Sequence, residues 1–184
     1  MRGKRPRPPR VPDDPSSDKL AYGKAVARLA RREMSSSEVR RGLTRDGFTE
    51  TAVETAVGRL VEQRYLDDSR LGERFARSRL ADRGLGRHRV RQALSQKGLS
   101  RGIIESSLRV ALADVSEAEA IDRLARRYWR QKVGHAPERR LKGLWAFLIR
   151  RGFPPGLVGD RLRALWPRWG DALAGLEPAA ESDE

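Results

Sequence analysis

The chain has 184 residues and carries 39 Lys and Arg against 25 Asp and Glu, a formal net charge of +14. It contains no cysteine, which excludes disulfides and thiolate metal sites and is typical of a reducing compartment, so we place the protein in the cytoplasm. No apolar run approaches the ~20 residues that span a bilayer, and no apolar segment follows the basic start, so we expect neither membrane insertion nor a secretory signal. The excess of positive charge favours a polyanionic partner, most simply nucleic acid or a protein assembly that contains it.

The two ends of the chain differ in composition from the part between them. Residues 1–17 are rich in proline, arginine and lysine, and they hold too little apolar surface to offset the entropy of ordering, so we expect disorder there. Residues 170–184 are acidic and contain no basic residue, and we interpret them as an acidic tail.

Between these ends, one apolar pattern occurs three times around a glycine. Aligned on Gly47, Gly98 and Gly152, the chain shows apolar residues at the same offsets without a gap. Positions three or four residues apart share one helix face, and glycine readily adopts the left-handed conformation that ends a helix. Each copy therefore predicts two helices joined at the glycine, and three copies in register indicate duplication. The repeated residues are Val39, Leu43, Phe48, Val53, Val57 and Leu60; Val90, Leu94, Leu99, Ile104, Leu108 and Ala111; and Leu144, Leu148, Phe153, Val158, Leu162 and Leu165.

A further helix precedes the pair in each copy, which gives three helices per repeat. We expect the repeats at residues 18–64, 65–113 and 114–169. In chain order, their helices are expected near 18–33, 36–47 and 49–63, then 67–83, 87–97 and 100–112, then 116–133, 137–151 and 154–166. Ser35 and Glu38 form the pattern of a capping box at the start of a second helix. The predicted fold is all-α, with three tandem three-helix repeats stacked into an elongated, curved body, because a unit of ~50 residues buries little surface alone.

The sequence lacks the residue sets that catalysis requires. It has no thiol nucleophile and no phosphate-binding loop of the Gly-x4-Gly-Lys-Ser/Thr type. His88 and His135 show no spacing typical of metal ligands, and we interpret them as exposed loop residues. We therefore predict that the protein is not an enzyme and has no cofactor and no metal site.

The positive charge is concentrated on the second helix of each repeat, whereas the third helices together carry no net charge. This argues against a helix-turn-helix DNA reader, in which the helix after the turn enters the major groove. We expect a broad basic face for backbone phosphates or acidic protein patches, without base readout, although ordinary solvated helix faces remain the alternative. Trp145 lies beside the core stripe, where it is either exposed to a partner or a base, or packed between repeats. The predicted binding residues are Arg70, Arg74, Arg77, Arg83, Arg87, Arg89, Arg91, Lys97, Arg126, Arg127, Arg130, Arg139, Arg140, Lys142, Trp145, Arg150 and Arg151.

Two segments carry a resemblance to a known family. The first runs from Tyr65-Leu66-Asp67-Asp68-Ser69-Arg70 through Arg74-Phe75-Ala76-Arg77 and Gly86 to Leu94-x2-Lys97-Gly98-Leu99, and the second is Phe147-Leu148-x-Arg150-Arg151-Gly152-Phe153-x4-Val158. Together with three tandem repeats, they resemble the RecX family over roughly residues 18–168. The resemblance implies a regulator that binds in the groove of the RecA–DNA filament, suppresses ATP hydrolysis and strand exchange, and also binds single- and double-stranded DNA. We expect a monomer, and an autonomous, sequence-nonspecific nucleic-acid-binding module is the alternative function.

Overall fold

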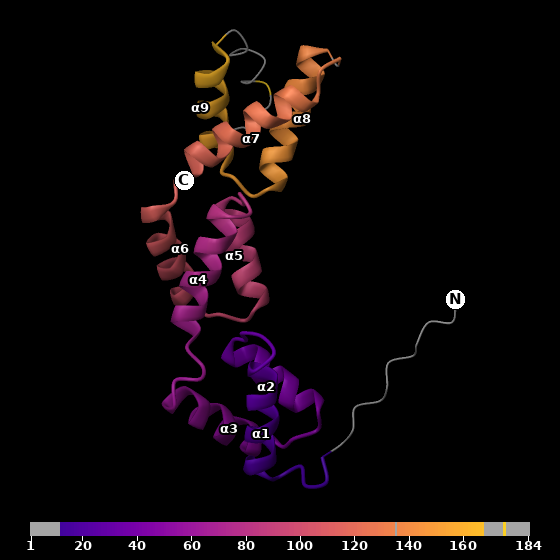
Figure 1. Cartoon of the computed structure of the whole chain (residues 1–184), viewed down its shortest axis with the longest axis vertical. Coiled ribbons are helices and arrows are strands. Elements are labelled where there is room, and N and C mark those ends of the chain that lie inside the picture. The colour runs from indigo at the N-terminus through magenta and orange to yellow at the C-terminus, as the bar shows by residue number, and fades with distance from the viewer. Residues whose placement is uncertain (1–11, 135, 168–174, 176–184) are drawn as a thin grey trace, which may run out of the picture. The chain divides into compact units, whose positions relative to one another are not determined.

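A computed structural model describes residues 12–134, 136–167 and 175 of the chain, and these residues form nine α-helices and no strand (Figure 1). The all-α prediction is therefore confirmed for the described part of the chain. Residues 1–11, nearly all of the acidic tail and His135 lie outside it. The helices are α1 (Asp18–Leu29), α2 (Ser36–Arg45), α3 (Glu50–Glu62), α4 (Asp68–Ala81), α5 (Arg87–Gln96), α6 (Arg101–Asp114), α7 (Glu117–Gln131), α8 (Pro137–Arg150) and α9 (Pro155–Leu165).

Side-chain caps fix where several helices begin. Ser35 accepts a hydrogen bond from the Glu38 amide while the Glu38 carboxylate accepts from the Ser35 amide, so the predicted capping box is present. Thr49 and Ser116 cap α3 and α7 with a single hydrogen bond each, in which the side-chain oxygen accepts from the backbone amide three residues later. The cap of α1 is Ser17, and the adjacent Asp18 places its carboxylate in the first turn.

Part of the segment that we expected to be disordered is ordered. Residues 12–17 form the turn that leads into α1, and the Pro15 carbonyl accepts a hydrogen bond from the Thr49 amide at 2.9 Å. The backbone of this turn is thus hydrogen-bonded to the loop between α2 and α3. This hydrogen bond offsets part of the conformational entropy that residues 12–17 lose when they become ordered, which their composition does not reveal.

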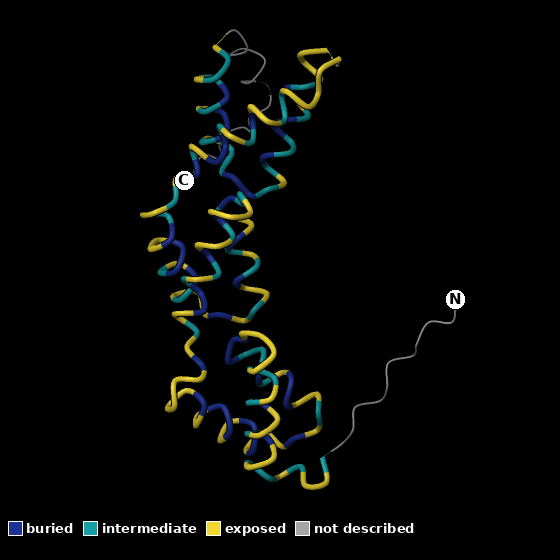
Figure 2. Tube along the Cα trace, in the orientation of Figure 1, coloured by how far each residue is buried: buried dark blue, intermediate teal, exposed yellow. Residues whose placement is uncertain are grey.

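The three aligned glycines end their helices as the repeat pattern predicts. Gly47, Gly98 and Gly152 have φ values of 95°, 78° and 86°, which is the left-handed region. The repeated apolar residues are buried at every position except Leu165, which is half-buried. Figure 2 shows buried stretches recurring along the helices, as expected when each helix packs one face against its neighbours.

The chain divides into two compact units, Met1–Gly72 with Gln96–Ile103 and Glu73–Ser95 with Ile104–Glu184. The first unit holds a core made by α1, α2 and α3. The second holds a core made by α7, α8 and α9, together with most of α4, α5 and α6. We call α1–α3, α4–α6 and α7–α9 repeats 1, 2 and 3.

Each unit contains one junction between neighbouring repeats, and the two junctions use the same chemistry. In the first unit, the amide of Ser36, the first residue of α2, donates to Asp68 Oδ1 at 2.8 Å. In the second unit, the amide of Arg87, the first residue of α5, donates to Glu117 Oε1 at 2.6 Å. In both cases a carboxylate at the start of the next repeat's first helix satisfies an amide that has no partner within its own helix.

The glycine turns complete these junctions. Ser35 Oγ donates to the Lys97 carbonyl at 2.5 Å, and the Gly86 amide donates to the Arg151 carbonyl at 2.9 Å. Both carbonyls belong to the residue before an aligned glycine. The repeat pattern thus encodes how adjacent repeats join as well as how each one folds.

Candidate functional site

The predicted basic residues fall into two groups, those with partners inside the protein and those without. Among the partnered cations, four form ion pairs: Arg77 with Asp114 at 2.7 Å, Arg87 with Glu117 at 2.6 Å, Arg91 with Glu105 at 2.7 Å, and Lys97 with Glu38 at 3.1 Å. The hydrogen bond from Arg91 to Glu105 raises the pKa of Arg91 above its ordinary value. These side chains link helices to one another. Because an acidic partner already neutralises part of their charge, they attract an external anion less strongly.

The other partnered cations contact carbonyls, rings or amides. Arg140 lies over the Trp129 ring, 4.0 Å from its centroid, and also donates to the Trp129 carbonyl. Arg151 donates to the carbonyls of Arg83 and Gly84 at 2.8 and 3.1 Å. Arg89 donates to Gln92. Arg74 also has an interaction within the protein.

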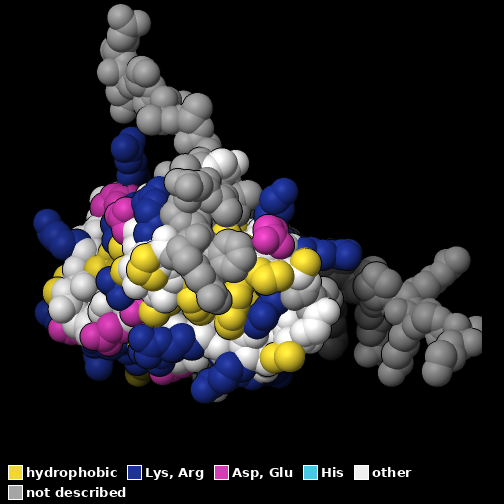
Figure 3. Space-filling model, turned by 90° about the horizontal axis from the view of Figure 1, so that it is seen from above, with side chains coloured by type: hydrophobic (Ala, Val, Ile, Leu, Met, Phe, Trp, Pro, Cys, Tyr) yellow, Lys and Arg dark blue, Asp and Glu magenta, His cyan; other side chains and the backbone are white. Residues whose placement is uncertain are grey.

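Eight predicted cations are exposed and have no side-chain partner among the described residues. Most of them lie in repeat 3. On α7, spacings of three and four residues place Arg126, Arg127 and Arg130 on one face, away from the buried Ile121 and Ala125. The remaining five are Arg70, Arg83, Arg139, Lys142 and Arg150. Figure 3 shows one face of the molecule, on which Lys and Arg side chains, with Asp and Glu side chains among them, lie around a group of hydrophobic side chains.

Trp145 is not part of an exposed surface. The residue is 8% exposed and packs in the core formed by α7, α8 and α9, so the alternative of an exposed Trp145 is wrong, and it packs within repeat 3 rather than between repeats. The physical reason lies at the equivalent positions of the other repeats, where Arg40 pairs with Glu54 and Arg91 pairs with Glu105. In repeat 3 the position of the glutamate is occupied by the buried Gly159, which provides no carboxylate and leaves space for a large apolar side chain.

Comparisons with known proteins agree with this architecture. Residues 21–60 match the family model of the first three-helix domain of RecX, and residues 67–108 match that of the second three-helix domain. The matches occur in the order of that family's domains and coincide with repeats 1 and 2. The chain belongs to the RecX family.

Two solved RecX structures share the fold. The crystal structure of RecX from Lactobacillus salivarius is 18% identical, with a TM-score of 0.71 over 80% of this chain and 96% of that chain. A crystal structure of regulatory protein RecX is 22% identical, with a TM-score of 0.67 over 78% of this chain and 71% of that chain. No curated protein sequence matches significantly.

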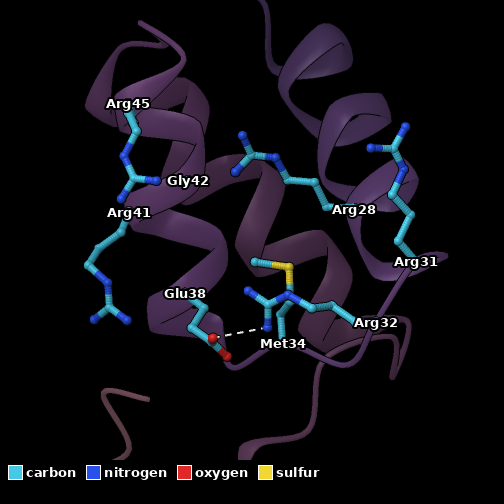
Figure 4. A pocket seen from close by; sticks show the side chains of 8 residues that line it. All are labelled: Arg28, Arg31, Arg32, Met34, Glu38, Arg41, Gly42 and Arg45. Carbon is cyan, nitrogen blue, oxygen red and sulfur yellow. Dashed lines mark hydrogen bonds and ion pairs between the residues drawn. The ribbon is translucent and has the colours of Figure 1, made fainter. Parts of the chain in front are cut away.

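Repeat 1 of this RecX-family chain carries a basic group that the sequence analysis did not select. Arg28, Arg31 and Arg32 from α1 and its end, with Arg41 and Arg45 from α2, line one cavity (Figure 4). Summing charge helix by helix concealed them, because Glu38 and Asp46 lower the net charge of α2 and the residues that follow it. The signal that could have found them is the spacing of three and four residues within each set, which is the spacing of neighbours on one helix face, although Arg31 and Arg32 follow the end of α1.

Two further kinds of feature, metal-binding clusters and membrane-spanning helices, are absent among the described residues. No three His, Asp or Glu side chains come together among them in a way that could hold a metal ion. No helix in the described ranges is long and apolar enough to cross a membrane.

Proposed function

We propose that this RecX-family protein is a negative regulator of the RecA recombinase that binds the RecA–DNA filament and suppresses its ATP hydrolysis and strand exchange. The observation that carries the proposal is the match of two consecutive repeats, in order, to the first and second three-helix domains of RecX. A regulator of this kind acts by binding and requires no catalytic residue of its own.

The exposed, unpaired arginines supply the contact surface in this proposal. A filament groove presents DNA phosphates and acidic protein patches, and arginine binds both through charge-assisted hydrogen bonds. Arg126, Arg127, Arg130, Arg139 and Lys142 can engage an anion without giving up an internal partner, because they have none among the described residues. Arg87 and Arg91, in contrast, would first have to leave Glu117 and Glu105.

The experiment is an ATPase titration on preformed filaments of RecA and single-stranded DNA. The wild-type chain is expected to lower ATP hydrolysis well below one molecule per RecA subunit, because a body of three repeats that contacts several subunits gains from multivalency. The double variant Arg127→Glu with Arg139→Glu is expected to lose most of this inhibition. The matched control, Arg101→Glu with Arg109→Glu, makes the same change of charge at exposed positions of α6 that have no partner among the described residues, and it is expected to inhibit like the wild type.

The same cations favour an autonomous nucleic-acid-binding module as the second candidate function, since phosphate contacts alone support sequence-independent binding. Adding RecA to a DNA-binding assay separates the two. A regulator binds RecA-coated DNA more tightly than bare DNA, whereas a module binds both equally and leaves ATP hydrolysis unchanged at an equimolar ratio.

A further inference from the structure

The arginine cavity of repeat 1 has an unusual lining. Its volume is ≈ 450 Å³, and five of the eight residues that line it are arginines, with Glu38 as the single acid among them. Figure 4 shows Arg28, Arg31 and Arg32 on one side and Arg41 and Arg45 on the other. Helices α1 and α2, with the two residues Arg31 and Arg32 just after α1, thus line one concave surface with five arginines, which is a high density of positive charge for a cavity of this size.

The acid in this cavity is already committed to other groups. Glu38 Oε2 accepts from the Ser35 amide at 3.0 Å and from Lys97 Nζ at 3.1 Å, and Glu38 Oε1 accepts from Arg32 at 3.0 Å. Burial raises the pKa of Glu38, but these three partners outweigh burial and lower it below its ordinary value. The carboxylate is therefore ionised at neutral pH and balanced by its own contacts.

The remaining arginines keep donors available. Arg28 pairs with Asp46 at 2.8 Å, and Arg41 donates to Ser37 Oγ at 2.8 Å. Arg31 and Arg45 are exposed and have no side-chain partner within the described part of the chain. A guanidinium has five N–H donors in a planar fork that matches the oxygens of a phosphate group. An anion in the cavity would therefore meet three arginines, Arg31, Arg41 and Arg45, that no acid among the described residues neutralises.

A glycine in the wall of the cavity makes room for one of these groups. Gly42 is buried in the middle of α2, and a Cβ atom at this position would lie 1.7 Å from Arg28 Nη1. Glycine inside a helix is destabilising relative to alanine. In return for this cost, the Arg28 guanidinium lies directly against the backbone of α2, where it faces the cavity (Figure 4).

We propose that this cavity binds a phosphodiester group of single-stranded DNA. The inference rests on the proposed contact with DNA but not on RecA. No aromatic side chain lines the cavity, so bases have no surface on which to stack and the contact is to the backbone. A single strand can bend a phosphate into a concave site, whereas a duplex is stiff over ~150 base pairs.

The neighbouring depression supports this assignment by contrast. It shares Arg41 and Arg45 with the cavity, but it is also lined by Glu50 and Glu54, and Glu54 pairs with Arg40. Two carboxylates there would repel a phosphate. The two adjacent depressions therefore differ in net charge, because five arginines face one acid in the first and three arginines face two acids in the second, and the proposed strand contact is confined to the one between α1 and α2.

The test measures binding of the full chain to a labelled oligothymidylate by fluorescence anisotropy across a salt series, without RecA. Arg31→Ala with Arg45→Ala is expected to weaken binding about tenfold, because hydrogen bonds to a charged phosphate no longer form. The slope of log affinity against log salt is expected to become shallower by about 0.7 for each phosphate that the variant no longer neutralises. The matched control, Arg64→Asn with Arg101→Ala, removes two exposed cations elsewhere in the same unit and is expected to change affinity less than about threefold.

Gly42→Ala separates geometry from charge. It leaves the net charge unchanged, favours the helix and displaces the Arg28 guanidinium, so binding is expected to weaken about three- to tenfold while the melting temperature stays equal or rises. Gly58→Ala in α3, where a Cβ meets nothing within 4 Å, is its control and is expected to bind like the wild type.

The proposal would be overturned if the Arg31/Arg45 and Gly42 variants bound the oligonucleotide like their controls. It would also be overturned if the wild-type chain bound a duplex of equal phosphate content as tightly as the single strand. A third contrary result, measured by capture of DNA-free RecA, would be cavity variants that bind the single strand normally but no longer bind RecA. The last result would assign the cavity to an acidic protein segment. The oligonucleotide assay contains no RecA, so its result does not depend on whether the chain regulates RecA. Failure of the proposed regulation would appear only in the ATPase titration.

Discussion

Glu117 is the residue whose removal tests the junction between repeats 2 and 3 most directly. Its side chain is buried, with the residue 5% exposed, and its two oxygens accept from the Arg87 amide and from Arg87 Nε, both at 2.6 Å. Glu117→Gln preserves the volume and one acceptor oxygen. The second oxygen becomes an amide N–H group that faces a guanidinium donor, so one charge-assisted hydrogen bond is removed and two donors oppose each other.

The size of the effect follows from burial. Breaking a fully buried ion pair costs about 3–5 kcal/mol, whereas a hydrogen bond to a charged group contributes about 1.5–3 kcal/mol. The Arg87 side chain is 40% exposed, so water can hydrate the guanidinium once its acidic partner is removed, and the lower range applies. We expect Glu117→Gln to lower the free energy of unfolding by about 2 kcal/mol, which corresponds to a fall of about 4–8 °C in melting temperature for a chain of this size.

The assay is urea denaturation followed by far-UV circular dichroism, with Glu119→Gln as the control. Glu119 lies in the same first turn of α7 but is not buried, and its side chain has no partner among the described residues. Both variants lose the same favourable interaction with the helix dipole, about 0.3–1 kcal/mol, so their difference isolates the contact with Arg87. If the two variants agree within about 0.5 kcal/mol, the carboxylate does not stabilise the start of α5 and the junction described above is wrong.

Three further substitutions test the repeat pattern and its caps. Leu94→Ala, at a position that is 0% exposed, is expected to cost about 2–5 kcal/mol of unfolding free energy, and a cost below about 0.5 kcal/mol would reject the repeat register. Gly152→Ala is expected to cost more than about 2 kcal/mol, because φ is +86° and a Cβ would lie 2.3 Å from the Arg89 amide nitrogen, whereas Gly156→Ala should cost almost nothing. The pKa of Glu38 is lowered on folding, so the stability that Glu38 contributes is present above its ordinary pKa of 4.5 and is lost as the pH falls through the folded pKa. Thermal melts of Glu38→Gln should therefore show a smaller loss of stability on acidification than those of the wild type. Parallel curves of melting temperature against pH for the two proteins would contradict this.

The helical fold could be predicted because its determinants are local. Apolar residues at helical spacing and a left-handed glycine act within a few residues of one another, and they placed the second and third helices close to their observed bounds. The first helices end earlier than predicted. α1 stops at Leu29 rather than near residue 33, since Ser35 must adopt an extended backbone, with ψ of 160°, to cap α2.

The candidate surface was less predictable because charge counting ignores partners. The acids that neutralise Arg77, Arg87 and Lys97 lie far away in sequence, so no local pattern marks these cations as structural. In repeat 1, charge counting instead overlooked available cations. Glu38 and Asp46 lowered the net charge of the second helix, although Glu38 is itself engaged by Lys97 and Arg32. Only tertiary contacts distinguish an available guanidinium from one that is already paired.

One position shows how duplication can guide such a distinction. Arg40 and Arg91 occupy the same place in repeats 1 and 2, and each pairs with a glutamate at the same distance beyond its aligned glycine. Repeat 3 replaces both members at once, with Trp145 for the arginine and Gly159 for the glutamate, and both are buried. A surface ion pair contributes about 0–1 kcal/mol, whereas burying a large aromatic side chain contributes more. This exchange therefore strengthens the core of repeat 3, which carries six of the eight predicted binding cations that have no side-chain partner among the described residues. The unpaired cations of α7 and α8 therefore have no structural role in that core, and repeat 3 can offer them to a polyanion without loosening its own fold.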